Sequence, residues 1–118
     1  MIKALVVDDD ADLLDMISLM LQTNEIQVTA LLDGMKLFDT LKSAIPDIII
    51  MDIFLGNCDG RELCKELRSH DSFCHIPVIL YTAADLSKDR LDNGCANLFM
   101  RKPFEMEQLL GSIRKLAA

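Results

Sequence analysis

The sequence predicts an α/β fold in which helices cover both faces of a parallel sheet. Short apolar runs alternate five times with segments whose apolar residues recur at helical spacing. Residues 48–51 are apolar throughout, as in a strand covered on both faces, whereas residues 27–31 alternate polar and apolar side chains, as an edge strand does. Strands that alternate with helices along the chain imply right-handed crossovers between parallel strands. This pattern, with the second strand at an edge of the sheet, favours a flavodoxin-like (βα)5 domain of strand order 2-1-3-4-5.

The first half of the chain predicts two strand–helix units. Residues 4–7 form an apolar strand that leads into three aspartates, and Asp10 is a suitable N-cap for the helix that follows. Residues 27–31 form the second strand, and Pro46 stops the second helix because proline cannot continue one. The apolar positions of the first helix are Leu13, Leu14, Ile17, Met20 and Leu21. Those of the second helix are Leu37, Phe38, Leu41 and Ile45.

The second half predicts three further strands, each followed by a helix. The strands are expected at residues 48–51, 78–81 and 98–100. Asp59 and Glu62 have the spacing of a capping box ahead of the third helix. Residues 86–93 specify the fourth helix weakly because Leu86 and Leu91 are their only apolar anchors. The last helix has a clear apolar face made of Met106, Leu109, Leu110, Ile113 and Leu116.

Length and composition limit the class of protein. A chain of 118 residues buries about two-thirds of its unfolded surface, so we expect one domain over residues 1–118 and no output domain. The net charge of −7 and the pI near 4.6 argue against nucleic-acid binding by this chain, because phosphates are bound by a basic face. No apolar run is long enough to span a membrane, and the start of the chain lacks the features of a signal peptide.

The cysteines predict reduced thiols in a cytoplasmic protein, because no Cys-x-x-Cys pair and no secretory signal are present. They are Cys58, Cys64, Cys74 and Cys95. A zinc site is an alternative, but the spacing of its candidate ligands matches no zinc template. Those candidates are Cys64, His70, Cys74 and His75. We therefore expect buried or loop thiols.

Polar residues follow the predicted strands at their carboxyl ends, where ligands bind in an open parallel sheet. They are Asp8, Asp9 and Asp10 after the first strand, Asp52 after the third, Thr82 after the fourth and Lys102 after the fifth. Clustered carboxylates repel one another unless a cation joins them, and an oxygen-rich site suits Mg²⁺. The threonine hydroxyl and the lysine ammonium beside them are suited to bind the oxygens of a phosphoryl group.

In these residues the chain resembles the receiver domains of two-component response regulators, from Ile2 to the last helix. The matching motifs are Val7-Asp8-Asp9, Asp52 followed by Asp59-Gly60, Ile76-Pro77-Val78-Ile79, Thr82-Ala83 and Lys102-Pro103-Phe104. Each motif is weak alone, but all of them in order at compatible spacings form a specific signal. The chain departs from the family at Gly56, where many members carry proline.

The resemblance implies a phosphorelay function. Asp52 would accept a phosphoryl group from a phosphohistidine on a sensor histidine kinase or a histidine phosphotransfer protein, and Thr82 and Lys102 would bind the phosphoryl oxygens. The Lys102–Pro103 peptide is expected to be cis. The implied Mg²⁺ ligands are Asp9, Asp52 and the backbone carbonyl of Phe54, with Asp8 acting directly or through water.

The resemblance also implies a conformational switch, with no enzyme activity beyond the domain's own phosphorylation and dephosphorylation. Phe99 occupies the position of an aromatic side chain that turns when the domain is phosphorylated. The change would control an output domain or a separate partner protein, and the domain would be a monomer or a weak phosphorylation-dependent dimer. A free-standing regulator and a receiver cut from a longer regulator or hybrid kinase look the same over this length.

Two functions of other classes stay open on the residues alone. A Mg²⁺-dependent phosphohydrolase of the haloacid dehalogenase type also uses a phosphorylated aspartate, a threonine and a lysine. Its first motif is echoed by Asp8-x-Asp10-x-Asp12, but Asp12 stands where Thr or Val is needed, and the chain has no room for a cap domain. The other is a flavodoxin-like interaction scaffold that is not phosphorylated. Turnover of a small phosphorylated substrate would favour the hydrolase, and stoichiometric self-labelling the receiver.

Overall fold

Five parallel strands form a sheet of order β2-β1-β3-β4-β5 in a computed structural model that describes residues 1–83, 95–102 and 105–117. The strands are β1 (Lys3–Val7), β2 (Gln27–Leu31), β3 (Ile48–Asp52), β4 (Val78–Thr82) and β5 (Leu98–Arg101). The α-helices of the described ranges are α1 (Ala11–Thr23), α2 (Leu37–Ser43), α3 (Gly60–Arg68) and α5 (Met106–Ala117), and residues Gly34–Lys36 form a 3-10 turn before α2. The predicted strand order is therefore confirmed.

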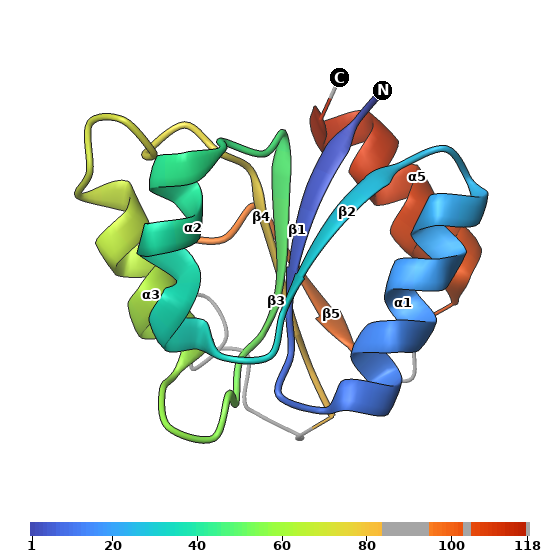
Figure 1. Cartoon of the computed structure of the whole chain (residues 1–118), viewed down its shortest axis with the longest axis horizontal. Helices are drawn as coiled ribbons and strands as arrows, with labels where there is room; N and C mark the ends of the chain where they lie inside the picture. Colours follow the sequence, from blue (N-terminus) through green and yellow to red (C-terminus); the bar gives the residue numbers. More distant parts are fainter. Residues whose placement is uncertain (84–94, 103–104, 118) are drawn as a thin grey trace.

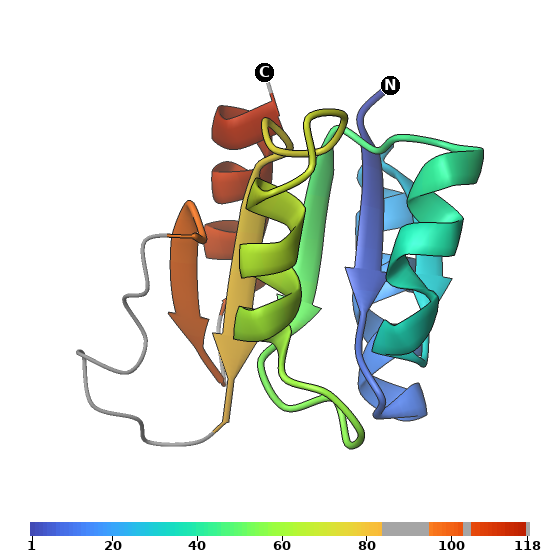
Figure 2. The same cartoon turned by 90° about the vertical axis from the view of Figure 1, so that its left-hand side faces the viewer.

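Helices cover both faces of the sheet, as predicted. Figure 1 shows α2 and α3 on one face and α1 and α5 on the other, and Figure 2 shows the same layers from the side of α3. Every residue of β3 and β4 is buried, whereas the edge strand β2 is largely exposed. Two apolar clusters result, one between the sheet and α1 with α5, the other between the sheet and α2 with α3. No helix in the described part of the chain has the length and apolar character needed to cross a membrane.

The caps predicted at Asp10 and Asp59 agree with the structure. The Asp10 carboxylate accepts the backbone N–H groups of Asp12 and Leu13, at 3.1 and 3.3 Å, and so caps α1. Asp59 caps α3 by accepting the N–H of Arg61 at 2.8 Å. In each case a side-chain oxygen satisfies a donor that the first helical turn leaves without a partner.

The predicted end of the second helix is wrong by two residues. Helix α2 ends at Ser43, Ala44 is extended (φ −158°, ψ 123°), and Ile45 is 50% exposed instead of facing the core. Pro46 disfavours helical geometry in the residue before it, so the chain leaves the helix early. The predicted fourth helix (residues 86–93) and the residues Pro103 and Phe104 lie outside the described residues.

Arg68, at the end of α3, joins that helix to the starts of β4 and β5. Its guanidinium donates to the carbonyls of Cys95 (2.9 Å), Cys74 (3.0 Å) and Ile76 (2.7 Å), and to the side-chain oxygen of Asn97 (3.0 Å). Asn97 in turn accepts the backbone N–H of Val78 at 2.9 Å and so ties the first residue of β4 to the segment before β5.

Arg68→Ala is expected to lower the free energy of unfolding by about 3 kcal/mol, because it removes charged donors from several carbonyls at once. Urea unfolding followed by circular dichroism measures this loss. Lys65→Ala is the matched control on the same helix, because the Lys65 ammonium is exposed and lies 3.6 Å from Glu62. The control should cost less than about 0.5 kcal/mol. Equal losses in the two variants would contradict the role given to Arg68.

Candidate functional site

The functional residues predicted from the sequence lie at one edge of the sheet because the strands are parallel. Asp8 and Asp9 follow β1, Asp52 is the last residue of β3, Thr82 is the last residue of β4, and Lys102 follows β5. This edge lies at the opposite end of the molecule from the two termini (Figure 1). All five residues therefore lie at the carboxyl end of the sheet, where open α/β sheets bind ligands.

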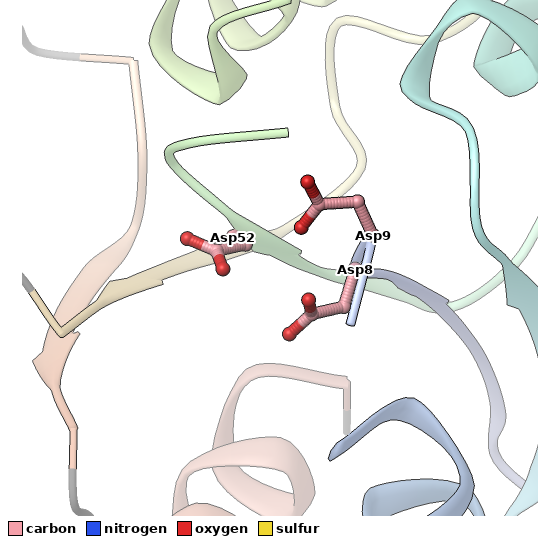
Figure 3. A group of neighbouring side chains, drawn as sticks. All are labelled: Asp8, Asp9 and Asp52. Atoms are coloured by element: carbon pink, nitrogen blue, oxygen red, sulfur yellow. The ribbon is translucent and has the colours of Figure 1, made fainter. Parts of the chain in front are cut away.

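Asp8, Asp9 and Asp52 form an acidic cluster that is capable of binding a metal ion. Each offers a carboxylate oxygen, and these oxygens lie within 4.8 Å of one another. Figure 3 shows the three side chains gathered at the ends of β1 and β3. Asp8 is fully buried and Asp52 is 7% exposed, whereas Asp9 is exposed. An ion would therefore approach from the side of Asp9 and meet two carboxylates at the edge of the core.

The cysteines and histidines do not form a comparable group. Within the described ranges, the acidic cluster is the only set of potential metal ligands that lies close enough together. All four cysteines are free thiols, and they range from the buried Cys64 to the exposed Cys74. Burial raises the pKa of the Cys64 thiol to about 11, which keeps it protonated at neutral pH. The zinc alternative is not supported.

Lys102 connects the acids to one another and to β4. Its ammonium Nζ lies 3.0 Å from Oδ2 of Asp52 and 3.5 Å from Oδ2 of Asp8. Its backbone N–H donates to the carbonyl of Thr82 at 2.8 Å, which fixes the start of the loop after β5. Thr82 itself is 2% exposed. The ammonium therefore offsets part of the repulsion between the two buried carboxylates.

Asp52 is a buried carboxyl with an altered pKa. Burial, which penalises the charged form, is the main cause that raises its pKa, and the charge of Asp8 adds to the increase. The hydrogen bond and the charge of Lys102 oppose the rise, as does the backbone N–H of Phe54, which donates to Oδ1 of Asp52 at 3.1 Å. Both oxygens of Asp52 are thus held in place by donors from two different loops.

The loop after β3 depends on Gly60. A Cβ atom at this position would collide with the backbone carbonyl oxygen of Asp52, so only glycine fits beside the acid. The N–H of Gly60 donates to the carbonyl of Ile53 at 2.6 Å, and Phe54 and Asp59 pair across the loop. Glycine after Asp59 is therefore needed for α3 to begin directly behind Asp52.

Phe54 follows Asp52 by two residues and Phe99 lies on β5, but the roles predicted for them stay predictions. Phe54 is 46% exposed, and the guanidinium carbon of Arg61 lies 5.9 Å from the centroid of its ring. Phe99 is partly buried on β5, paired with Leu80 of β4, and packs against the cluster on the side of α2 and α3. It lies two residues before Arg101, which pairs with Thr82 across the sheet.

Sequence reasoning missed Tyr81. This residue is 1% exposed, its hydroxyl donates to Oδ2 of Asp8 at 2.7 Å, and Nζ of Lys102 lies 4.8 Å from the centroid of its ring. The available signal was a tyrosine in an otherwise apolar buried strand, directly before Thr82. A buried tyrosine needs a partner for its hydroxyl, and here the partner is an acid of the site.

Comparison with known proteins identifies the family. The response regulator receiver domain profile matches residues 4–114. The chain is 39% identical over 116 residues to the "Heme response regulator HssR" of Staphylococcus epidermidis, covering 97% of this chain and 50% of that protein. The chain thus spans about half the length of the curated relatives it matches.

Solved structures support the same assignment. A putative response regulator from Chloroflexus aurantiacus superposes with a TM-score of 0.89 at 28% identity, covering 98% of this chain and 97% of that one. The receiver domain of a sensor histidine kinase from Pseudomonas aeruginosa, with a magnesium ion in its active-site cleft, superposes with a TM-score of 0.88 at 28% identity and covers 98% and 97%. Because the match to receiver domains extends over nearly all of the sequence, it favours a receiver domain over a phosphohydrolase. The chain therefore belongs to the response regulator receiver domain family.

Proposed function

We propose that this receiver domain takes up a phosphoryl group on Asp52 from a phosphohistidine of a sensor histidine kinase or a histidine phosphotransfer protein. The observation that carries the proposal is the surrounding of Asp52, a buried carboxylate with Nζ of Lys102 at 3.0 Å and the carboxylates of Asp8 and Asp9 close by. Transfer of a phosphoryl group depends mainly on positioning and on neutralising charge. This surrounding supplies both.

The donor set fits Mg²⁺, because it consists of carboxylate oxygens gathered at a partly exposed edge. Asp9, Asp52 and the backbone carbonyl of Phe54 would hold the ion, with Asp8 acting directly or through water. Bound there, Mg²⁺ would offset the negative charge shared by the carboxylates and the phosphoryl group. The magnesium ion in the cleft of the Pseudomonas aeruginosa receiver domain supports this choice of metal.

The transfer is a displacement at phosphorus. A carboxylate oxygen of Asp52 attacks the phosphorus in line with the bond to the donor imidazole, the new O–P bond forms, and the N–P bond breaks. The electron pair of that bond returns to the imidazole nitrogen. Lys102 would move its ammonium from the free carboxylate to a phosphoryl oxygen, and the hydroxyl of Thr82 would donate to another.

Phosphorylation would then act as a switch. Thr82 and Phe99 belong to neighbouring strands that meet at this edge, so a movement of Thr82 toward the phosphoryl group would change the space beside Phe99 and the surface formed by β5 and α5. The output would be a further domain or a separate partner, because the curated relatives are about twice as long as this chain. Residues 1–118 would form one monomeric or weakly dimerising module, working in the cytoplasm with its thiols reduced.

Asp52→Asn is expected to abolish phosphorylation. The wild-type domain, incubated with Mg²⁺ and a small phosphodonor such as acetyl phosphate, should gain one phosphoryl group by intact mass spectrometry and lose it to hydroxylamine, as an acyl phosphate does. The matched control is Asp15→Asn, which removes an exposed acid of α1 outside the cluster and should label like the wild type. Equal labelling of the Asp52→Asn protein would contradict the assignment. A wild type that never labels would favour the interaction scaffold.

A further inference from the structure

We propose that Tyr81 is a positioning residue that holds the Asp8 carboxylate and the Lys102 ammonium in place for metal binding and phosphoryl transfer, a role that rests on the proposed function. Its hydroxyl contacts the acid and its ring contacts the lysine. In this scheme the side chain of Tyr81 does not contact the transferred group, although its backbone pairs with Asp52 across β3 and β4. It acts through Asp8 and Lys102.

Side chains along β4 alternate between the two faces of the sheet, and this explains how Tyr81 reaches the site from the face covered by α1 and α5. Tyr81 and Ile79 point to the layer of α1 and α5, whereas Leu80 points to the layer of α2 and α3. Strand β3 lies between β4 and β1, so the hydroxyl reaches past the strand of Asp52 to the end of β1. The ring is 1% exposed and is packed in the apolar cluster of α1 and α5, which leaves the hydroxyl no freedom to turn away.

Asp8 depends on such donors because it is fully buried. Its Oδ1 accepts the backbone N–H of Asp10 at 2.9 Å, and its Oδ2 accepts the hydroxyl of Tyr81 at 2.7 Å, with Nζ of Lys102 3.5 Å away. A buried carboxylate is costly unless its oxygens are hydrogen-bonded. The short bond from Tyr81 therefore fixes how Asp8 is turned toward the metal position.

The ring of Tyr81 has a second effect. Nζ of Lys102 lies 4.8 Å from the ring centroid, within the range in which an ammonium is attracted to the face of an aromatic ring. The same ammonium is 3.0 Å from Asp52. The ring thus keeps Lys102 beside the carboxylate to be phosphorylated, and the two contacts can be separated by substitution.

Tyr81→Phe removes the hydroxyl and keeps the ring. Hydrogen-bond partners that orient a metal ligand typically contribute 10- to 100-fold to metal affinity, so the dissociation constant for Mg²⁺ should rise about tenfold. Isothermal titration with MgCl₂ on the unphosphorylated domain measures it. Tyr81→Leu also removes the ring. It should show the same loss of Mg²⁺ affinity and, in addition, slower phosphorylation by acetyl phosphate.

The control separates positioning from packing. Ile79→Val lies two residues earlier on β4, faces the same layer, and removes apolar contact without touching the acids. It should lower stability and leave the Mg²⁺ dissociation constant unchanged. If Ile79→Val weakens Mg²⁺ binding as much as Tyr81→Phe does, or if Tyr81→Phe binds like the wild type, the role of Tyr81 is refuted. If the wild type binds no Mg²⁺, the proposed metal site fails, and the role of Tyr81 with it.

A spectroscopic measurement tests the same inference without a variant of Tyr81. The chain has one tyrosine and no tryptophan, so its ultraviolet-excited emission comes from Tyr81. A hydroxyl that donates to a carboxylate quenches tyrosine emission, and an ion drawing electron density from Asp8 weakens that bond. Saturating Mg²⁺ should therefore raise the emission of the wild type, whereas Asp8→Asn should be brighter without Mg²⁺ and should not respond. Wild-type emission that is indifferent to Mg²⁺ would overturn the proposal.

Discussion

Saturating Mg²⁺ is expected to raise the free energy of unfolding of this domain by about 2.7 kcal/mol when the free ion is at about 100 times its dissociation constant. The physical reason is the acidic cluster, in which Asp8, Asp9 and Asp52 bring their oxygens within 4.8 Å of one another at the edge of the core. Folding brings these charges together, and a bound cation offsets their repulsion only in the folded state. For a domain of this size the gain corresponds to a rise in Tm of about 10 °C.

The measurement is thermal unfolding with and without MgCl₂, at ionic strength matched with NaCl. Asp9→Ala removes the exposed carboxylate of the cluster and should lose most of the Mg²⁺-dependent rise in Tm. Asp15→Ala removes the same charge from the exposed face of α1 and should keep it. A wild-type Tm that does not change with Mg²⁺ would refute the metal site, and an equal loss in both variants would point to general screening of charge.

Asp52 makes the stability of the metal-free domain depend on pH. Burial raises the pKa of the Asp52 carboxyl above its ordinary value of 3.8, so folding favours the protonated acid. The stability that this group contributes is fully present below pH 3.8 and is lost as the pH rises through the raised pKa. Without Mg²⁺, the wild type should therefore lose stability relative to Asp52→Asn over that range, as measured by urea unfolding at several pH values. Parallel pH curves for the two proteins would contradict this.

The fold was predictable because each element carries a local pattern. The apolar run of β3 and the alternation of β2 distinguish a central strand from an edge strand, and Asp10 and Asp59 mark helix starts through bonds to residues two or three positions away. The end of α2 was less predictable, because Pro46 acts on the backbone before it and the helix ended two residues earlier than its apolar spacing indicates.

The site was predictable where strand ends specify it and unpredictable where distant side chains meet. Parallel strands bring Asp8, Asp52 and Lys102 to one edge whatever the packing, so their convergence follows from the order of the elements. The bond between Tyr81 and Asp8 joins residues 73 positions apart, and Arg68 reaches 27 positions ahead to Cys95. Such contacts depend on side-chain geometry across layers, which no local pattern encodes.

Phe54→Asn is expected to speed the loss of the phosphoryl group from Asp52 about tenfold, which corresponds to about 1.4 kcal/mol in the barrier. Hydrolysis needs a water molecule aligned opposite the bond between Asp52 and phosphorus. Phe54 stands two residues after Asp52, its N–H donates to Oδ1 of that acid at 3.1 Å, and the residue is 46% exposed. An apolar ring there excludes water and has no group to orient it, whereas an asparagine side chain can do so.

The alternative is that Arg61, whose guanidinium carbon lies 5.9 Å from the ring centroid, holds Phe54 away from the approach of water. Decay of the phosphoryl label after removal of the donor, at fixed Mg²⁺ and pH, distinguishes the two arrangements. Phe54→Leu keeps an apolar side chain and should decay within about twofold of the wild type, a difference of roughly 0.4 kcal/mol in the barrier. Arg61→Ala removes the guanidinium beside the ring. If the ring already covers the site, this variant should decay at the wild-type rate, and if Arg61 holds the ring away, the variant should decay more slowly. Should Phe54→Asn decay at the wild-type rate or more slowly, the ring does not shield the acyl phosphate, and the barrier to its hydrolysis lies with other residues around Asp52.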